Sequence, residues 1–258
     1  MTLAHRSAGR PRAGSGASAW FRVHRAADET RLRLICFPHA GGTAQLYHGW
    51  RALLPQDVEL LAVRYPGRQD RFTEPCAERM DDLADAIDAA LEPYLDRPLA
   101  LFGHSMGSSV AYEVALRLEK RGIVPRRLLV SGRAAPHRAE RTEMHKSDDA
   151  TLIAEVRRLG NLDAEAYDIP ELRELLLPAL RADYRLLENY RPQHPARVRA
   201  PITAYTGDED PHCAVDDART WSELTAPGAF DVRSFQGDHF YLVPRERELL
   251  ADISGRLR

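Results

Sequence analysis

Short hydrophobic runs alternate with amphipathic stretches along most of the chain. The runs fall at 33–37, 58–63, 99–102, 128–130, 202–205 and 230–235. Each run has the length of a strand. Short apolar strands separated by helices are typical of a parallel sheet that helices cover on both faces. The pattern therefore predicts an α/β fold with a mostly parallel sheet.

The stretches between the runs carry apolar residues at helical spacing. Met80, Leu83, Ile87 and Leu91 lie at i, i+3, i+7 and i+11, which places them on one face of a helix. A second apolar stripe covers 110–118, and Gly122 follows it at the position of a helix C-cap. A last helix is predicted over 246–257.

One long segment breaks this alternation. Between about 133 and 192 no strand is predicted, and two helical stretches, 148–159 and 170–190, take its place. Pro178 is expected to interrupt the second stretch. A helical insertion between two strands predicts a lid over the end of the sheet. The alternative is a crossover packed on the face of the sheet.

Composition limits the classes of protein that fit. The chain has 258 residues, of which 44% are hydrophobic, and a formal net charge of −2. This predicts one domain over 20–258 with a large core, and it argues against a dedicated nucleic-acid binder. Residues 1–19 are basic without an apolar centre, so we expect a flexible tail rather than a secretory signal.

The cysteines and the apolar runs indicate the cellular setting. Cys36, Cys76 and Cys213 are widely spaced and form no C-x-x-C pair, which argues against a zinc knuckle or a redox dithiol. No apolar run approaches the ~18 residues of a membrane span. We therefore expect a cytoplasmic protein, and we favour a monomer.

The candidate chemistry begins at a serine between two glycines. Gly103-His104-Ser105-Met106-Gly107 fits G-x-S-x-G, directly after the run at 99–102 and before a predicted helix. In this strand–turn–helix context the serine is a candidate nucleophile on a strained turn. The small neighbours leave room for the strand and the helix to approach each other closely.

A serine hydroxyl needs a base, and the base needs an orienting carboxylate. In hydrolases of this architecture the chain order is serine, acid, histidine. His239 follows the last predicted strand after a short turn and is the candidate base. The strand at 202–205 leads into GDEDP, where Asp210 is the preferred acid and Asp208 the reserve.

The other histidines fit the base less well. His137 and His145 fall at the start of the insertion, His194 precedes a proline-containing linker, and His212 comes directly after the acidic turn. His104 is expected to pack beside the serine.

A paired-glycine loop supplies the remaining part of the site. The early strand leads into Phe37-Pro38-His39-Ala40-Gly41-Gly42, where backbone N–H groups can approach a substrate oxygen. We expect the N–H groups of Ala40 and Met106 to form an oxyanion hole. His39 is expected to fix this loop by hydrogen bonds. Such a site requires no metal and no bound cofactor.

Several of these motifs together resemble the type II thioesterases that accompany polyketide synthases and nonribosomal peptide synthetases. The motifs are FPHAGG, RYPGRQDR, LFGHSMGSSVAYEVA, LRADYRLLENY, TGDEDP and GDHFYL. The resemblance runs from about residue 20 to the C-terminus. It implies an α/β-hydrolase fold with a helical lid, and Ser105, Asp210 and His239 as the catalytic triad.

The resemblance also implies the substrate. Type II thioesterases hydrolyse acyl thioesters on the phosphopantetheine arm of acyl carrier or peptidyl carrier proteins, and so free stalled synthases. Arg64, Arg68 and Arg71 are candidates for contact with an acidic carrier protein, or are solvated surface charges.

Three alternatives stay open from the sequence. The chain could be an oxygen-ester or amide hydrolase of the same fold, because a triad does not determine the leaving group. It could be a terminal thioesterase, although these are normally fused to a synthase. It could also be a catalytically silent binding protein, although such proteins usually lack a triad residue and every candidate is present here.

Overall fold

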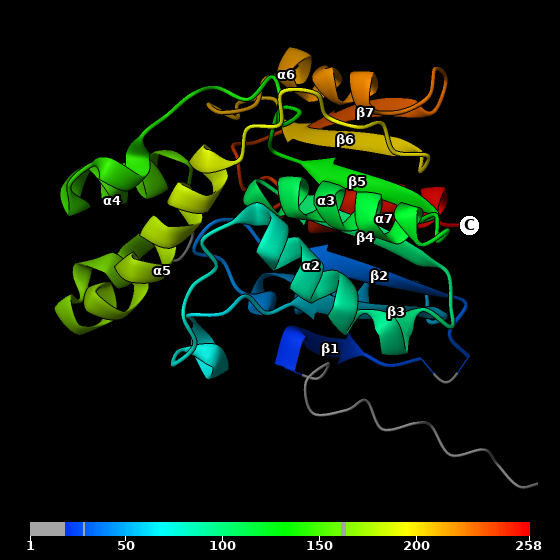
Figure 1. The fold of residues 1–258 in the computed structure, drawn as a ribbon, viewed down its shortest axis with the longest axis horizontal. Coiled ribbons are helices and arrows are strands. Elements are labelled where there is room, and N and C mark those ends of the chain that lie inside the picture. Colours follow the sequence, from blue (N-terminus) through cyan, green and yellow to red (C-terminus); the bar gives the residue numbers. More distant parts are fainter. Residues whose placement is uncertain (1–18, 28, 161–163) are drawn as a thin grey trace, which may run out of the picture.

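A mostly parallel sheet forms the centre of the structure (Figure 1). The computed structural model describes residues 19–27, 29–160 and 164–258, and in these the sheet has seven strands in the order β1-β3-β2-β4-β5-β6-β7. The strands are β1 (Phe21–Arg25), β2 (Leu32–Phe37), β3 (Val58–Val63), β4 (Leu99–His104), β5 (Arg127–Ser131), β6 (Ile202–Gly207) and β7 (Phe230–Phe235). All neighbours pair in parallel except β1, which is antiparallel to β3.

Six of the strands match the predicted runs, and β1 was not predicted. Its sequence, FRVHR, buries Phe21 alone and leaves the other four side chains partly or fully exposed. It lies at the edge of the sheet and pairs through backbone hydrogen bonds. Because these do not require apolar side chains, the sequence of β1 shows no hydrophobic run. Edge strands of this kind are often polar.

Helices cover both faces of the sheet, as the runs predicted. On one face, α2 (Met80–Ala90) and α3 (Met106–Lys120) pack against side chains such as Ile35 and Leu61. On the other face, α7 (Glu246–Arg256) and the short 3-10 helices η1 (Ala44–Tyr47) and η2 (Gly49–Ala52) pack against strand side chains such as Leu34 and Leu60. Because successive side chains of a strand face opposite ways, each central strand contributes to both cores.

The insertion forms a lid segment (residues 133–192), whose described residues contain no strand. Its main helices are α4 (Asp149–Arg158) and α5 (Pro170–Asn189), with η5 (Met144–Lys146) and η6 (Ala164–Asp168) beside them. Figure 1 shows α4 and α5 beyond the carboxyl ends of the strands rather than on a face of the sheet. The insertion is therefore a lid and not a crossover.

The predicted interruption at Pro178 is wrong. Helix α5 runs through Pro178 without a break. Proline removes one backbone hydrogen bond, but Pro178 is exposed, so water can satisfy the freed carbonyl, while Leu177 and Leu180 bury the other face. Packing of this face outweighs the local cost.

The remaining elements connect these layers. They are η3 (Gln69–Arg71), η4 (Glu92–Tyr94), α6 (Val215–Arg219) and η7 (Thr220–Leu224). The predicted tail, 1–19, lies outside the described residues apart from Ala19. Within the described ranges, no helix combines the length and the apolar character needed to cross a membrane.

Candidate active site

Ser105 lies on a sharp turn between the end of β4 and the start of α3. Its φ of 53° and ψ of −117° place it in a region that few residues other than glycine adopt. A Cβ at Gly103 would lie 2.1 Å from the carbonyl oxygen of Gly107, and one at Gly107 would lie 2.0 Å from that of Phe37. The two glycines are therefore required by the close approach of strand, loop and helix.

Backbone and side-chain hydrogen bonds fix this turn. The Ser105 N–H donates to the carbonyl of Ser131 at the end of the adjacent strand β5, at 2.7 Å. Buried Ser108 donates from its hydroxyl to the carbonyls of Gly103 and Ser131, at 2.8 and 3.0 Å. The strained backbone is thus held by the elements around it, as strain at functional sites usually is.

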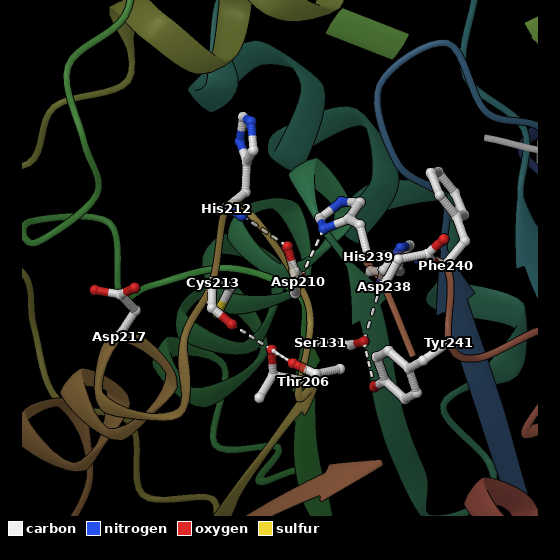
Figure 2. A network of polar contacts seen from close by, with 12 residues as sticks. Ser131, Thr206, Asp210, His212, Cys213, Asp217, Asp238, His239, Phe240 and Tyr241 are labelled. Atoms are coloured by element: carbon white, nitrogen blue, oxygen red, sulfur yellow. Dashed lines mark hydrogen bonds and ion pairs between the residues drawn. The ribbon is translucent and has the colours of Figure 1, made fainter. Parts of the chain in front are cut away.

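His239 and Asp210 form a buried hydrogen-bonded pair (Figure 2). His239 Nδ1 lies 2.8 Å from Asp210 Oδ2, and the two side chains are 2% and 0% exposed. Asp210 follows β6 and His239 follows β7, so neighbouring strands bring them together at the carboxyl edge of the sheet. The other oxygen of Asp210 accepts the N–H of His212 at 2.8 Å.

The reserve acid, Asp208, has a different contact. Its Oδ1 accepts the N–H of Gly237 at 2.9 Å. It therefore holds the loop that carries His239 and does not contact the imidazole. Of the two carboxylates considered for this role, Asp210 is the one bonded to His239.

Ser105 and His239 line one pocket beneath the lid segment. Because Nδ1 of His239 is bonded to Asp210, Nε2 is the nitrogen left for a partner in the pocket. In the described residues no hydrogen bond joins this imidazole to the Ser105 hydroxyl. Catalytic hydrogen bonds are often long before substrate binds. The pocket wall includes Ala40, Arg133, Val156, Leu159, Leu180, Tyr184, Leu187 and Phe240.

The two expected oxyanion donors border Ser105 from different elements. Met106 is the first residue of α3, where N–H groups have no partner within the helix. Ala40 lies in the loop after β2, and its N–H makes no hydrogen bond to the described part of the chain. The next N–H, that of Gly41, is already bonded to Asp183 Oδ2 at 2.7 Å.

This loop is tied to the lid by a buried ion pair. Asp183 of α5 receives two hydrogen bonds from Arg68, at 2.5 and 2.7 Å, and both residues are buried. Burial disfavours the charge on Arg68, but Asp183 outweighs it and holds the pKa of Arg68 above its usual value. One carboxylate thus joins α5, Arg68 and the Gly41 N–H.

The three arginines considered for carrier contact are engaged within the chain. Arg64 pairs with Asp70, Arg68 with Asp183 and Arg71 with Glu74. Arg71 is also buried and lies 4.0 Å from the centre of the Trp20 ring. Arg68 and Arg71 are therefore structural, and the suggestion that they meet a partner on the surface is wrong.

Two buried histidines, His39 and His104, lie near His239. The rings of His104 and His239 lie 4.8 Å apart, and those of His39 and Phe240 also lie 4.8 Å apart. His104 Nδ1 lies 3.0 Å from the Ser131 hydroxyl, which agrees with its predicted packing role. The side chain of His39 makes no hydrogen bond within the described residues, so the prediction that it fixes its loop in that way is wrong.

Burial keeps these two histidines uncharged. It lowers the pKa of His39 to about 3, with smaller contributions from His239 and Arg68. It lowers the pKa of His104 well below its usual value, and His239 and His39 add to the effect. Across the described ranges, no group of three or more His, Cys, Asp or Glu side chains is placed to hold a metal ion.

Asp183 and Arg133 both lie beside this site, and neither was predicted from the sequence. Asp183 had a signal, since it is a carboxylate on the apolar face of α5, among Leu180, Leu186 and Leu187. Arg133 had none, because an arginine at the start of an insertion is usually a surface charge.

The sheet order, the strained turn at Ser105 and the lid over the carboxyl edge define an α/β-hydrolase. Residues 32–257 match the family model described as "Thioesterase domain". The chain belongs to the thioesterase family, and its solved relatives place it among the type II thioesterases.

Three relatives are similar to this chain over most of their own length. "Thioesterase PikA5" of Streptomyces venezuelae is 42% identical over 92% of this chain and 85% of its own. The type II thioesterase BorB from the borrelidin biosynthetic cluster is 43% identical, with a TM-score of 0.84 over 93% of this chain and 98% of that one. The RedJ thioesterase from the prodiginine pathway of Streptomyces coelicolor is 38% identical, with a TM-score of 0.81 over 88% and 86%.

Proposed function

We propose that this thioesterase hydrolyses acyl thioesters carried on the phosphopantetheine arm of acyl carrier or peptidyl carrier proteins. Its role would be to free synthases that are stalled by an unproductive acyl group. Relatives named for the borrelidin, prodiginine and yersiniabactin pathways support this assignment. The three free cysteines fit a reducing, cytoplasmic setting.

The observation that carries the proposal is the buried pair of His239 and Asp210 in the pocket that Ser105 also lines. In the proposed mechanism His239 Nε2 takes the proton of Ser105 as its oxygen attacks the thioester carbonyl. Asp210 holds the imidazole in the required tautomer and stabilises its charged form.

Backbone N–H groups receive the charge that develops on the carbonyl oxygen. The donors in this proposal are Ala40 and Met106, the latter at the positive end of α3. The carbon–sulfur bond breaks, and the pantetheine sulfur leaves with the proton from His239. Water then attacks the acyl-serine, His239 takes one of its protons, and a free acid departs as Ser105 regains its hydrogen.

The test uses carrier proteins loaded with different acyl groups, analysed by mass spectrometry before and after treatment. The chain is expected to remove the acyl group and leave the arm. Ser105→Ala is expected to lower kcat by about 10⁴-fold or more, since removing the nucleophile of a triad has effects of this size. Asp210→Asn, which keeps the shape of the side chain, is expected to lower it by about 10⁴-fold.

Two outcomes would contradict the proposal. Undiminished hydrolysis by Ser105→Ala would refute the nucleophile. A clear preference for aryl esters over acyl-pantetheine thioesters, measured in parallel, would favour an oxygen-ester hydrolase instead.

A further inference from the structure

A guanidinium group without a partner lies in the pocket that holds Ser105 and His239. Arg133 follows β5 by two residues and lines this pocket. Its side chain makes no ion pair and no hydrogen bond with the described part of the chain, and its Nε is fully buried. Guanidinium groups in protein interiors are normally paired.

The nearby charged groups do not neutralise the positive charge of Arg133. The carboxylate of Glu188 on α5 raises the pKa of Arg133 only slightly, and both of its oxygens are already bonded. They accept hydrogen bonds from the Thr142 hydroxyl and the Met144 N–H, at 2.5 and 2.7 Å, and from His145. Arg191, also in the pocket wall, adds a second positive charge. Burial lowers the pKa of Arg133 to about 10, so it stays charged at neutral pH.

The backbone around Arg133 is fixed. The Trp221 indole N–H donates to the Arg133 carbonyl at 2.8 Å, and the Gly132 N–H donates to the carbonyl of Tyr205 at 2.9 Å. Arg133 is therefore carried on a fixed stretch of backbone, two residues after the end of β5 and at the start of the lid segment. A half-buried charge on a fixed backbone, without a partner in the described residues, is suited to bind a small group of opposite sign.

Arg133 lines the same pocket as Ser105 and His239, so the anion that it binds would lie near the reacting bond. A Cβ at the preceding residue, Gly132, would lie 3.0 Å from Cε1 of His239. The backbone that carries Arg133 thus passes beside the imidazole of His239. The phosphate of a phosphopantetheine arm is at the opposite end of the arm from the thioester, whereas an acyl substituent begins at the thioester carbonyl.

We propose that Arg133 is an anion-binding residue of the acyl pocket, and that it selects acyl groups with a carboxylate a few bonds from the thioester carbonyl. The substrates would be half-thioesters of small dicarboxylic acids. This inference rests on the proposed function, since it names the acyl groups that the same site accepts.

The test compares matched thioesters of pantetheine, which lack the phosphate. Succinyl-pantetheine carries the carboxylate, its carboxamide analogue has the same shape without the charge, and butyryl-pantetheine reports basal hydrolysis. In the wild type, kcat/KM is expected to be higher for the carboxylate than for the carboxamide. Arg133→Met is expected to lower that ratio by about 10- to 100-fold, the range for a hydrogen bond to a charged group.

Two variants serve as controls. Arg133→Lys keeps the charge and is expected to retain part of the preference. Arg247→Met removes an exposed arginine of α7 and is expected to leave the ratio unchanged. A measurement on the wild type alone covers the case in which Arg133→Met does not fold: succinate should inhibit butyryl-pantetheine hydrolysis more strongly than neutral succinamide does, at equal ionic strength.

The outcomes separate this inference from the proposed function. If the wild type does not hydrolyse butyryl-pantetheine or any loaded carrier, the proposed function fails. If hydrolysis occurs but the ratio is the same in Arg133→Met, or succinate and succinamide inhibit equally, only the role of Arg133 is refuted. It is also refuted if Arg133→Met weakens hydrolysis of coenzyme A thioesters relative to pantetheine thioesters whatever the acyl group, because the ligand is then the phosphate.

Discussion

At the scale of single residues, the site holds side chains and backbone in states that they would rarely adopt in water. His39 and His104 are kept neutral by burial beside His239. Ser105 adopts a backbone conformation that neighbouring elements impose. Each of these states costs free energy on its own and persists because the surrounding packing leaves no alternative.

The buried histidines predict how stability depends on pH. The pKa of His39 in the folded protein, about 3, lies below its unfolded value of 6.5. Between these values the unfolded chain takes up a proton that the folded chain excludes, so the free energy of unfolding falls as pH falls. For His39 the slope is at most about 1.4 kcal/mol per pH unit.

Urea unfolding at about pH 7 and pH 5 measures this effect. His39→Leu is expected to lose less stability than the wild type on acidification, because it removes one of the groups that must charge. His104 acts in the same direction and leaves a residual slope. Equal losses in the wild type and in His39→Leu would show that His39 does charge in the folded state.

At the scale of elements, the loop after β2 and the lid helix α5 are joined through one carboxylate. Asp183 accepts the Gly41 N–H and both hydrogen bonds of Arg68. The loop also holds Ala40, whose N–H is a proposed oxyanion donor. The position of α5 is therefore coupled to the position of this donor.

Replacing Asp183 tests this coupling. Asp183→Ala leaves Arg68 as a buried charge without its partner and is expected to destabilise the fold by about 3–5 kcal/mol. It is also expected to lower kcat, by up to about 100-fold if the donor shifts by about an ångström. Urea unfolding and steady-state kinetics measure the two effects.

A double variant separates stability from catalysis. Arg68→Met with Asp183→Leu replaces the pair by apolar side chains and is expected to recover most of the stability. It gives the Gly41 N–H no acceptor, so kcat should stay low. Recovery of both stability and kcat would mean that the pair supports the fold alone.

At the scale of the whole molecule, the sheet and the lid have separate apolar cores. The sheet is packed on both faces, whereas the lid has a small cluster of its own around Leu152, Val156 and Leu177. Smaller cores resist local opening less. The ion pair of Arg68 with Asp183 ties the lid to the body beside the active site.

Hydrogen exchange followed by mass spectrometry tests whether the lid opens as a unit. Amides of α4 and of the first half of α5 are expected to exchange through local opening, while those of β4 and β5 exchange at the rate of global unfolding. Equal protection in the lid and in the sheet would contradict this division. Asp183→Asn is expected to raise exchange in α5 more than in β4.

The sequence by itself determined the elements and the residues that candidate chemistry requires. The short hydrophobic runs predicted six of the seven strands in the described residues, because buried parallel strands must be apolar on both faces. The spacing of glycines around Ser105 gave the turn, because only glycine tolerates such close backbone approach. The histidine after the last strand and the carboxylates after the strand before it were found in the same way.

Tertiary structure alone decided which side chains meet. Asp210 rather than Asp208 bonds His239, because the loop geometry after β6 directs one carboxylate to the imidazole and the other to a backbone N–H. No pattern in the neighbouring sequence predicts three other features: the polar edge strand β1, the buried pair of Arg68 and Asp183, and the unpaired Arg133. Their surroundings come from segments distant in the chain, so burial and charge at these positions are fixed only when the chain has folded.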